Sequence, residues 1–287
     1  MKNILVATDL SERSDRAIRR ATLLARTFDA ALLLVHVIDD DQPQRIVKAE
    51  EQMAADLLAA QSRSLREVDG LRCESRILLG DSFNAINCTA QEEEVDLLVI
   101  GPHRRQILKD VFVGTTAERL IRISSRPVLM ANAVPVAPYR QIMIATDLSD
   151  CSGDALRAAV ALNLLSKSAA SVLYVFDAPA TGLMNRASLS EDQIQDYMYN
   201  EEQRASLDLL AFLVEHDLRS LPCILKPAMS SVENVILSAA RDISAEVIVI
   251  GSQGETGIAK MLLGSVAEKV LRMADRDILV VPPQSRD

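Results

Sequence analysis

A nine-residue stretch near the N-terminus recurs in the middle of the chain. Residues 3–11 read Asn-Ile-Leu-Val-Ala-Thr-Asp-Leu-Ser, and residues 141–149 read Gln-Ile-Met-Ile-Ala-Thr-Asp-Leu-Ser, an offset of 138 positions. Further along, Gly101 and Gly251 open two glycine-containing stretches at an offset of 150 positions, so the second half carries twelve more residues, most of them within 178–199. The chain is therefore a tandem duplication that must fold into two similar units.

Each half alternates short runs of Val, Ile and Leu with longer helical patterns. The apolar runs are too continuous for strands that face water on one side, so we expect strands buried on both faces of a parallel sheet. Patterns such as 15–28 and 50–68 predict helices between them, which gives an α/β fold with a five-stranded sheet in each half. The expected strands are residues 3–8, 31–38, 73–79, 95–100 and 127–131, and then 141–146, 170–176, 222–226, 246–250 and 278–281.

The segment 134–139, Val-Pro-Val-Ala-Pro-Tyr, is the expected linker between the halves. Its two prolines cannot extend either a helix or a central strand. We therefore expect one domain over residues 1–134 and a second over residues 138–287. A chain of 287 residues, 49% of them hydrophobic, has room for two cores of ordinary size.

The charge balance and the aromatic content exclude one class of partner. The chain has 31 basic and 40 acidic side chains, a formal net charge of −9, with five Phe, four Tyr and no Trp. Binding to nucleic acid needs a basic face, and single strands are also bound by stacking on aromatic side chains. We therefore expect no nucleic-acid partner.

Several other patterns point to a cytoplasmic protein. No apolar run approaches the length of a membrane span, and the N-terminus lacks a signal-peptide pattern. The four cysteines form no Cys-x-x-Cys pair, and the three histidines are scattered. We expect reduced thiols, no membrane contact and no metal site built from Cys or His.

Polar residues and glycines gather where the predicted strands end. Asp9 and Asp147 close the first strand of each half, and Gly101 and Gly251 follow the fourth. In an open parallel sheet, ligands bind at the carboxyl ends of the strands, where the strand order reverses. Local structure alone also explains these residues, because glycine marks tight turns and the serine two positions after each aspartate is a good helix N-cap.

The stretch that begins at Gly251 has the features of a phosphate-binding loop. Gly251 permits a backbone conformation denied to other residues, and Gly254 lets the next turn approach a ligand closely. Gly264 and Ser265 then offer free backbone N–H groups and a hydroxyl at a helix N-terminus, where the helix dipole favours an anion. The stretch differs from the P-loop and from the Gly-x-Gly-x-x-Gly pattern of dinucleotide-binding proteins.

With its flanking strands, this pattern resembles the ATP-binding form of the universal stress protein domain, and the resemblance covers nearly the whole chain twice. Thr146-Asp147-Leu148-Ser149 ends the strand before the glycines, and 277–282 follows them. The resemblance implies two tandem Rossmann-like domains, similar to adenine nucleotide alpha hydrolases, with strand order 3-2-1-4-5 in each.

The resemblance also implies a role for individual residues. Asp147 and Val175 would hold the adenine and ribose, Ile250 would line the ribose and phosphates with the first two glycines, and the start of the following helix would take the triphosphate. The full set of implied nucleotide contacts is Ala145, Asp147, Val175, Ile250, Gly251, Gly254, Gly264, Ser265 and Val266.

The first half departs from the family's ATP-binding pattern at one position. Arg104 stands where the second half has Gly254, and Pro102 and His103 fill the same turn. A side chain there would occupy the space of the phosphates, so we expect this half not to bind ATP. Binding of a different anion by Arg104 and Arg105 is the alternative. The residues that the first half keeps are Asp9, Val37, Gly101, Gly114 and Thr115.

The resemblance implies a regulatory module of the stress response that holds ATP, with or without Mg²⁺, in its C-terminal domain. A slow ATPase or phosphotransferase is the first alternative, since Glu255 and Lys260 also lie near the predicted phosphates, although phosphoryl transfer needs an organised metal site and a positioned nucleophile. A protein that binds only a protein partner is the second. The complete glycine spacing of the second half counts against it.

Family members commonly pair their domains through the last strand. Residues 127–130 and 278–281 are those strands here, so the resemblance implies that the two halves pair within one chain as a pseudo-dimer. A further homodimer and an unknown protein partner are compatible with this arrangement.

Overall fold

Both halves of the molecule alternate strands and helices. The structure is a computed structural model that describes residues 1–102, 116–179, 190–254 and 263–284. The first half contains β1 (Asn3–Ala7), α1 (Ser14–Phe28), β2 (Ala31–Ile38), α2 (Gln44–Glu67), β3 (Cys73–Leu79), α3 (Ser82–Glu92), β4 (Leu97–Ile100), α4 (Thr116–Ile123) and β5 (Val128–Met130). The second contains β6 (Gln141–Thr146), α5 (Asp150–Ala161), the 3-10 helix η1 (Leu164–Ser166), β7 (Ala169–Phe176), α7 (Glu191–Glu215), β8 (Cys223–Pro227), α8 (Val232–Asp242), β9 (Val247–Gly251), α9 (Ser265–Met273) and β10 (Asp277–Val281).

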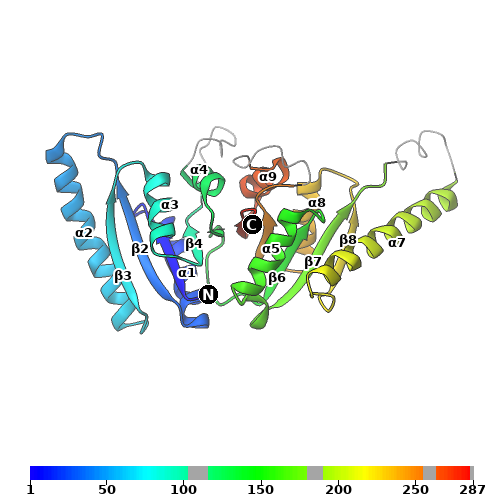
Figure 1. The fold of residues 1–287 in the computed structure, drawn as a ribbon, viewed down its shortest axis with the longest axis horizontal. Helices are drawn as coiled ribbons and strands as arrows, with labels where there is room; N and C mark the ends of the chain where they lie inside the picture. The colour runs from blue at the N-terminus through cyan, green and yellow to red at the C-terminus, as the bar shows by residue number, and fades with distance from the viewer. Residues whose placement is uncertain (103–115, 180–189, 255–262, 285–287) are drawn as a thin grey trace.

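All ten of these strands belong to one sheet, in the order β3-β2-β1-β4-β5-β10-β9-β6-β7-β8 (Figure 1). Within each half the order is 3-2-1-4-5, and neighbouring strands run parallel. The predicted α/β fold is confirmed. In each half the strand order reverses between the first strand and the fourth, which is where an open parallel sheet offers a binding crevice.

The sheet separates two hydrophobic layers, and each layer runs through both halves. One layer lies under α1, α2, α5 and α7, and the other lies under α3, α4, α8 and α9. Successive residues of a strand point to opposite layers, as Ile4 and Leu5 do in β1. Leu129 and Leu279 of the last strands join the first layer across the middle of the molecule.

The two halves meet through their last strands. β5 and β10 are antiparallel, with Ile278 opposite Met130, Leu279 opposite Leu129 and Val280 opposite Val128. All six side chains are buried. The predicted pairing of the two halves within one chain is confirmed, and neither half leaves this edge strand exposed to another chain.

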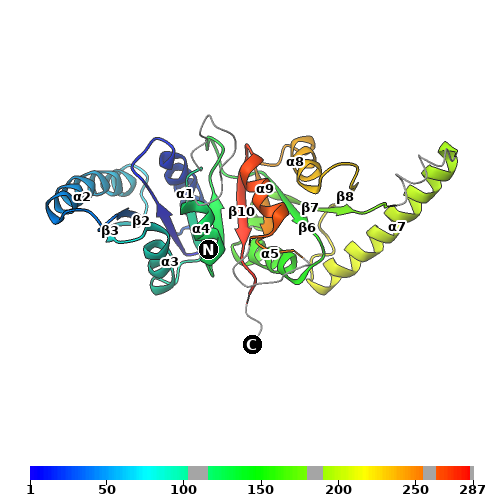
Figure 2. The same ribbon diagram turned by 90° about the horizontal axis from the view of Figure 1, so that it is seen from above.

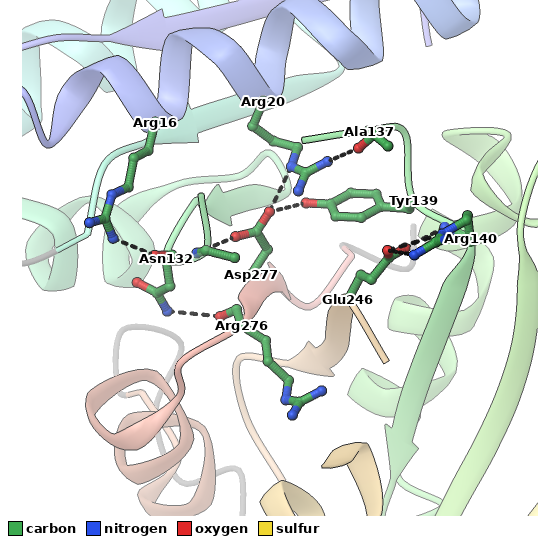
Figure 3. Close-up of polar contacts among 10 residues, drawn as sticks. Arg16, Arg20, Asn132, Ala137, Tyr139, Arg140, Glu246, Arg276 and Asp277 are labelled. Carbon is green, nitrogen blue, oxygen red and sulfur yellow. Dashed lines mark hydrogen bonds and ion pairs between the residues drawn. The ribbon is translucent and has the colours of Figure 1, made fainter. Parts of the chain in front are cut away.

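A buried cluster of Arg20, Tyr139 and Asp277 connects the two halves beside the paired strands β5 and β10 (Figure 3). Asp277, at the start of β10, has no exposed surface, and Arg20 of α1 is 4% exposed. Arg20 Nε donates to Asp277 Oδ2 at 2.7 Å, and the Tyr139 hydroxyl donates to the same oxygen at 2.6 Å. The backbone N–H of Ala133 donates to Asp277 Oδ1 at 2.9 Å. Arg20 also lies over the Tyr139 ring, with Cζ 4.0 Å from the ring centroid.

The same cluster fixes the linker between the halves. Arg20 Nη1 donates to the Ala137 carbonyl at 2.9 Å, and Arg16 Nη1 donates to the Asn132 carbonyl at 2.7 Å. Asn132 Nδ2 in turn donates to the Arg276 carbonyl at 3.0 Å. The linker therefore lies in a defined position between α1 and the start of β10.

Candidate functional site

The site predicted in the second half begins with the turn that follows β6. Leu148 has a φ of 64°, in the left-handed region that side chains of this kind rarely adopt. Its backbone N–H donates to Thr146 Oγ1 at 2.9 Å, and the backbone N–H and hydroxyl of Ser149 donate to Asp147 Oδ1 at 3.1 and 2.5 Å. These bonds fix the Asp147 carboxylate at the carboxyl edge of the sheet.

The serine of this turn begins a helix in only one of the two halves. Ser149 is the N-cap of α5, and its Oγ accepts from the backbone N–H of Ser152 at 3.3 Å, as predicted. The equivalent prediction for the first half is wrong, because α1 begins after Arg13 and Ser11 instead donates its hydroxyl to Asp9. The aspartate is therefore held by its serine in both halves, independently of helix capping.

Close packing explains the glycine at position 251. A Cβ on Gly251 would lie 3.0 Å from Cys151 Sγ and 3.1 Å from the Cys151 carbonyl oxygen. Its backbone is not in the left-handed region, where the described glycines are Gly70 and Gly80. The prediction that Gly251 adopts a conformation denied to other residues is therefore wrong. Glycine is needed because the first turn of α5 presses against the end of β9.

Gly254 lies against the carboxylate of Asp147. A Cβ at this position would be 2.8 Å from Asp147 Oδ2, closer than real Cβ atoms approach, so any side chain would displace the carboxylate. The loop after β9 thus reaches back to the end of β6. The structure brings Gly254 and Asp147 together, although 107 positions separate them in the sequence.

The first turn of α9 starts directly after Gly264. The Gly264 N–H donates to the Ser252 carbonyl at 2.8 Å, so the prediction that this amide is free is wrong. The bond ties the start of α9 to the loop after β9. Glu268 donates the first helical bond to the Gly264 carbonyl at 2.9 Å, so the amides of residues 265–267 form the helix N-terminus, where an anion is favoured.

The remaining predicted residues form an apolar wall beside the carboxylate. Ala145 of β6 and Ile250 of β9 are 8% and 5% exposed and belong to the same hydrophobic layer. Val175 of β7 and Val266 of α9 are half-buried and contact that layer. Because β7, β6 and β9 are neighbours in the sheet, the wall spans three strand ends. An apolar wall with a few polar groups suits a planar organic ring.

A cavity of about 410 Å³ lies at the equivalent edge of the first half, and the sequence analysis did not predict it. It is lined by counterparts of the predicted site residues, namely Ala7, Asp9, Val37, Ile100 and Gly101. The turn after β1 repeats the turn after β6: Leu10 has a φ of 59°, and its N–H donates to Thr8 Oγ1 at 3.0 Å. The cavity could have been predicted from the sequence, because the first half retains all five of these residues from the repeat.

An ion pair distinguishes the first-half cavity. Arg13 occupies the position of Cys151, and its Nη2 lies 3.8 Å from Asp9 Oδ2. Burial raises the pKa of Asp9, but hydrogen bonds from Ser11 and Ser14 and the Arg13 guanidinium together hold it below its usual range. His36 Nδ1 lies 2.8 Å from the Thr8 carbonyl oxygen. The first half therefore places an ion pair where the second half has a buried thiol.

Some predicted residues lie outside the described part of the structure. These are His103, Arg104, Arg105, Gly114, Thr115, Glu255 and Lys260. The obstruction of the first half by Arg104 stays a prediction. Among the helices that the structure describes, none has both the length and the apolar character needed to cross a membrane.

Known proteins resemble both the separate halves and the whole chain. The universal stress protein family matches residues 1–132 and 138–282. A universal stress protein of Methanocaldococcus jannaschii is 31% identical over 150 residues, which cover 52% of this chain and 85% of that protein. A universal stress protein of Mycolicibacterium smegmatis is 24% identical over 318 residues, which cover 98% of this chain and 97% of that protein. Among solved structures, a universal stress protein from Archaeoglobus fulgidus aligns over 98% of both chains, with a TM-score of 0.75 and 19% identity, which shows a shared fold.

Proposed function

The chain belongs to the universal stress protein family, and on that premise we propose that it is a regulatory protein of the stress response whose C-terminal half binds ATP. The proposed units are residues 1–134 and 138–287. The first unit pairs with the second through β5 and β10 and leaves ATP binding to it.

The observation that carries this proposal is the contact between Gly254 and Asp147. A Cβ on Gly254 would lie 2.8 Å from Asp147 Oδ2, so only glycine leaves the carboxylate in place. The same loop is bonded to the start of α9 through Ser252 and Gly264. The loop after β9 therefore connects a carboxylate acceptor with a helix N-terminus, which is an arrangement suited to a nucleoside with phosphates attached.

Six of the predicted residues contact the nucleotide in this proposal. The Asp147 carboxylate accepts hydrogen bonds from ribose hydroxyl or adenine amino groups, and the wall of Ala145, Val175 and Ile250 contacts the base. Ser265 and Val266 donate backbone N–H groups to the phosphates at the N-terminus of α9. A Mg²⁺ ion accompanying ATP is held mainly by the phosphates and water, as is usual for this ion.

Titration calorimetry with ATP tests the proposal on the wild type and on two exchanged variants. The wild type binds one ATP per chain. Gly254→Arg, which copies the first-half residue into the second half, lowers the affinity by at least about 100-fold, because a long side chain enters the phosphate space and displaces Asp147. Arg104→Gly still gives one site, because Pro102 and His103 also alter that turn.

Thermal unfolding of Gly254→Arg is the control for loss of the fold. The atom nearest to the new side chain is Asp147 Oδ2, at the end of a side chain that can move. We therefore expect the midpoint of thermal unfolding to stay close to that of the wild type. Two ATP sites in the wild type, or unchanged affinity in Gly254→Arg, would contradict the proposal.

A further inference from the structure

The helix α7 is buried over only part of its length. Its buried side chains are Ala205, Leu209, Phe212 and Leu213, so the stretch 191–204 buries none fully. The helix α2 in the first half is buried at intervals from Val47 to Leu65. Figures 1 and 2 show α7 running outward past β8 at one end of the molecule. The N-terminal part of α7 is therefore a stretch of helix that the sheet does not cover.

Exposed residues follow one line along the outer face of α7. Steps of four, three, four, four, three and four residues connect them, and such steps keep side chains on a single helix face. Tyr199 is 62% exposed, Leu207 68%, Leu210 48% and Val214 50%. The line consists of Asp192, Asp196, Tyr199, Gln203, Leu207, Leu210 and Val214, so it is acidic at its N-terminal end and apolar at its C-terminal end.

The helix α7 carries far more acidic than basic side chains. Its 25 residues include seven acidic side chains and one basic side chain, Arg204, which is paired with Glu201 of the same helix at 3.3 Å. The helix α2 also exposes apolar side chains, including Met53 and Leu57, but it carries four acidic and four basic residues. Only α7 therefore combines an exposed apolar line with a strong negative charge, among the helices at the two ends of the sheet.

We propose that the outer face of α7 is a docking surface for a cationic amphipathic helix of a protein partner. The apolar side chains of such a helix cover Leu207, Leu210 and Val214, and its basic residues face Asp192 and Asp196. This surface is separate from the proposed ATP site and does not depend on it. The partner supplies the positive charge that α7 itself lacks.

Charge also decides between this partner and two other occupants. A second copy docking through α7 would place two strongly acidic helices together on a chain whose net charge is already −9. An anionic lipid surface would repel the same residues. A cationic protein segment is the occupant that gains from both the apolar line and the charge.

A peptide of about 18 residues, built from Leu and Lys in amphipathic helical order, is the probe. Fluorescence anisotropy measures its binding to the full chain. A shuffled peptide of the same composition controls for charge alone. Leu207→Ser/Leu210→Ser removes the apolar line and Asp192→Lys/Asp196→Lys reverses the charge at its acidic end. All four side chains are exposed, so neither double variant disturbs the core.

The expected result is that the ordered peptide binds the wild type and that each α7 double variant weakens binding by about tenfold or more. Met53→Ser/Leu57→Ser on α2 leaves binding unchanged. Absence of binding, equal binding of the shuffled peptide, or an equal loss in the α2 variant would overturn the proposal. Size-exclusion chromatography gives a further test: a wild-type dimer that Leu207→Ser/Leu210→Ser converts to monomer would assign the face to a second copy instead.

Discussion

The turns after β1 and β6 are nearly identical, whereas their surroundings differ. In both, a leucine adopts a left-handed backbone, with φ of 59° at Leu10 and 64° at Leu148, and a serine donates to the preceding aspartate. Both turns therefore hold a strained residue that is stabilised by the same local bonds. Around them, Arg13 replaces Cys151 and Arg104 replaces Gly254.

This comparison separates glycines that serve the fold from glycines that leave room for a ligand. Gly101 and Gly251 are counterparts in the two halves, and a Cβ on either would come within 3.1 Å of the start of the helix that follows the first strand of its half, α1 or α5. Their retention is explained by packing alone. Gly254 is present only in the second half, so it is the position that tests whether one half binds what the other does not.

The largest predicted effect on stability concerns the junction between the halves, where the second half has a charged residue and the first half does not. Asp277 accepts from Arg20 in a buried site, whereas Pro127 is its counterpart in the first half. Asp277→Ala leaves the Arg20 guanidinium buried without its carboxylate, so we expect the free energy of unfolding to fall by about 3–5 kcal/mol. Urea unfolding measures this change.

The matched control is Asp275→Ala, two residues away. The Asp275 side chain is 66% exposed and is paired with Arg276 at its surface, so its removal should change stability by less than about 1 kcal/mol. A loss below about 1 kcal/mol in Asp277→Ala would mean that the asymmetry of the junction contributes little to stability.

The glycine comparison predicts equal effects in the two halves. Gly101→Ala and Gly251→Ala each force a Cβ against backbone atoms at the start of α1 or α5, so each should lower the free energy of unfolding by about 1–3 kcal/mol. Gly264→Ala is the control. Its φ of −63° suits any residue, and its Cβ would have its nearest contacts at 3.5 Å, so stability should change by less than about 0.5 kcal/mol.

Chemical denaturation of the three variants gives the comparison directly. A large loss in Gly251→Ala with none in Gly101→Ala would show that the two glycines do not share one role. If Gly264→Ala unfolds as easily as Gly251→Ala, Gly264 belongs with the glycines that serve the fold.

The smallest predicted effect is the pH dependence of the first-half turn. Partial desolvation tends to raise the pKa of Asp9, but hydrogen bonds, chiefly from Ser11, lower it overall in the folded protein. The ionised carboxylate therefore stabilises the fold above the unfolded-state pKa of about 4, and this contribution is lost as the pH falls through the folded pKa. Asp9→Asn should have a lower melting temperature than the wild type near pH 6, and the difference should shrink below pH 4. A difference independent of pH would contradict this assignment.

The duplication and the continuous apolar runs were enough to predict two α/β units with buried parallel strands, because these patterns lie within one half and repeat in the other. The strand order and the pairing of β5 with β10 were predicted only through the resemblance to the family. The contacts that the sequence did not reveal join distant positions. Gly251 is packed against Cys151, 100 positions away, and Arg20 bonds to Asp277, 257 positions away. The first-half cavity was not predicted because Arg104 indicates a filled phosphate space, even though five residues that line the cavity are retained from the repeat.

The buried pair at the junction also selects which halves can associate. Two copies of the first half, paired through β5, would each bury Arg20 opposite a proline, and two copies of the second half would each bury Asp277 with Ala158 at the position of Arg20. Pairing of two identical halves is thus unfavourable, because each buries a charged side chain without its partner. Pairing of a first half with a second half brings Arg20 and Asp277 together. Where many copies of this chain or related single domains are present, the cluster favours the union of unlike halves, and so keeps the half that has Gly254 together with the half that has Arg104.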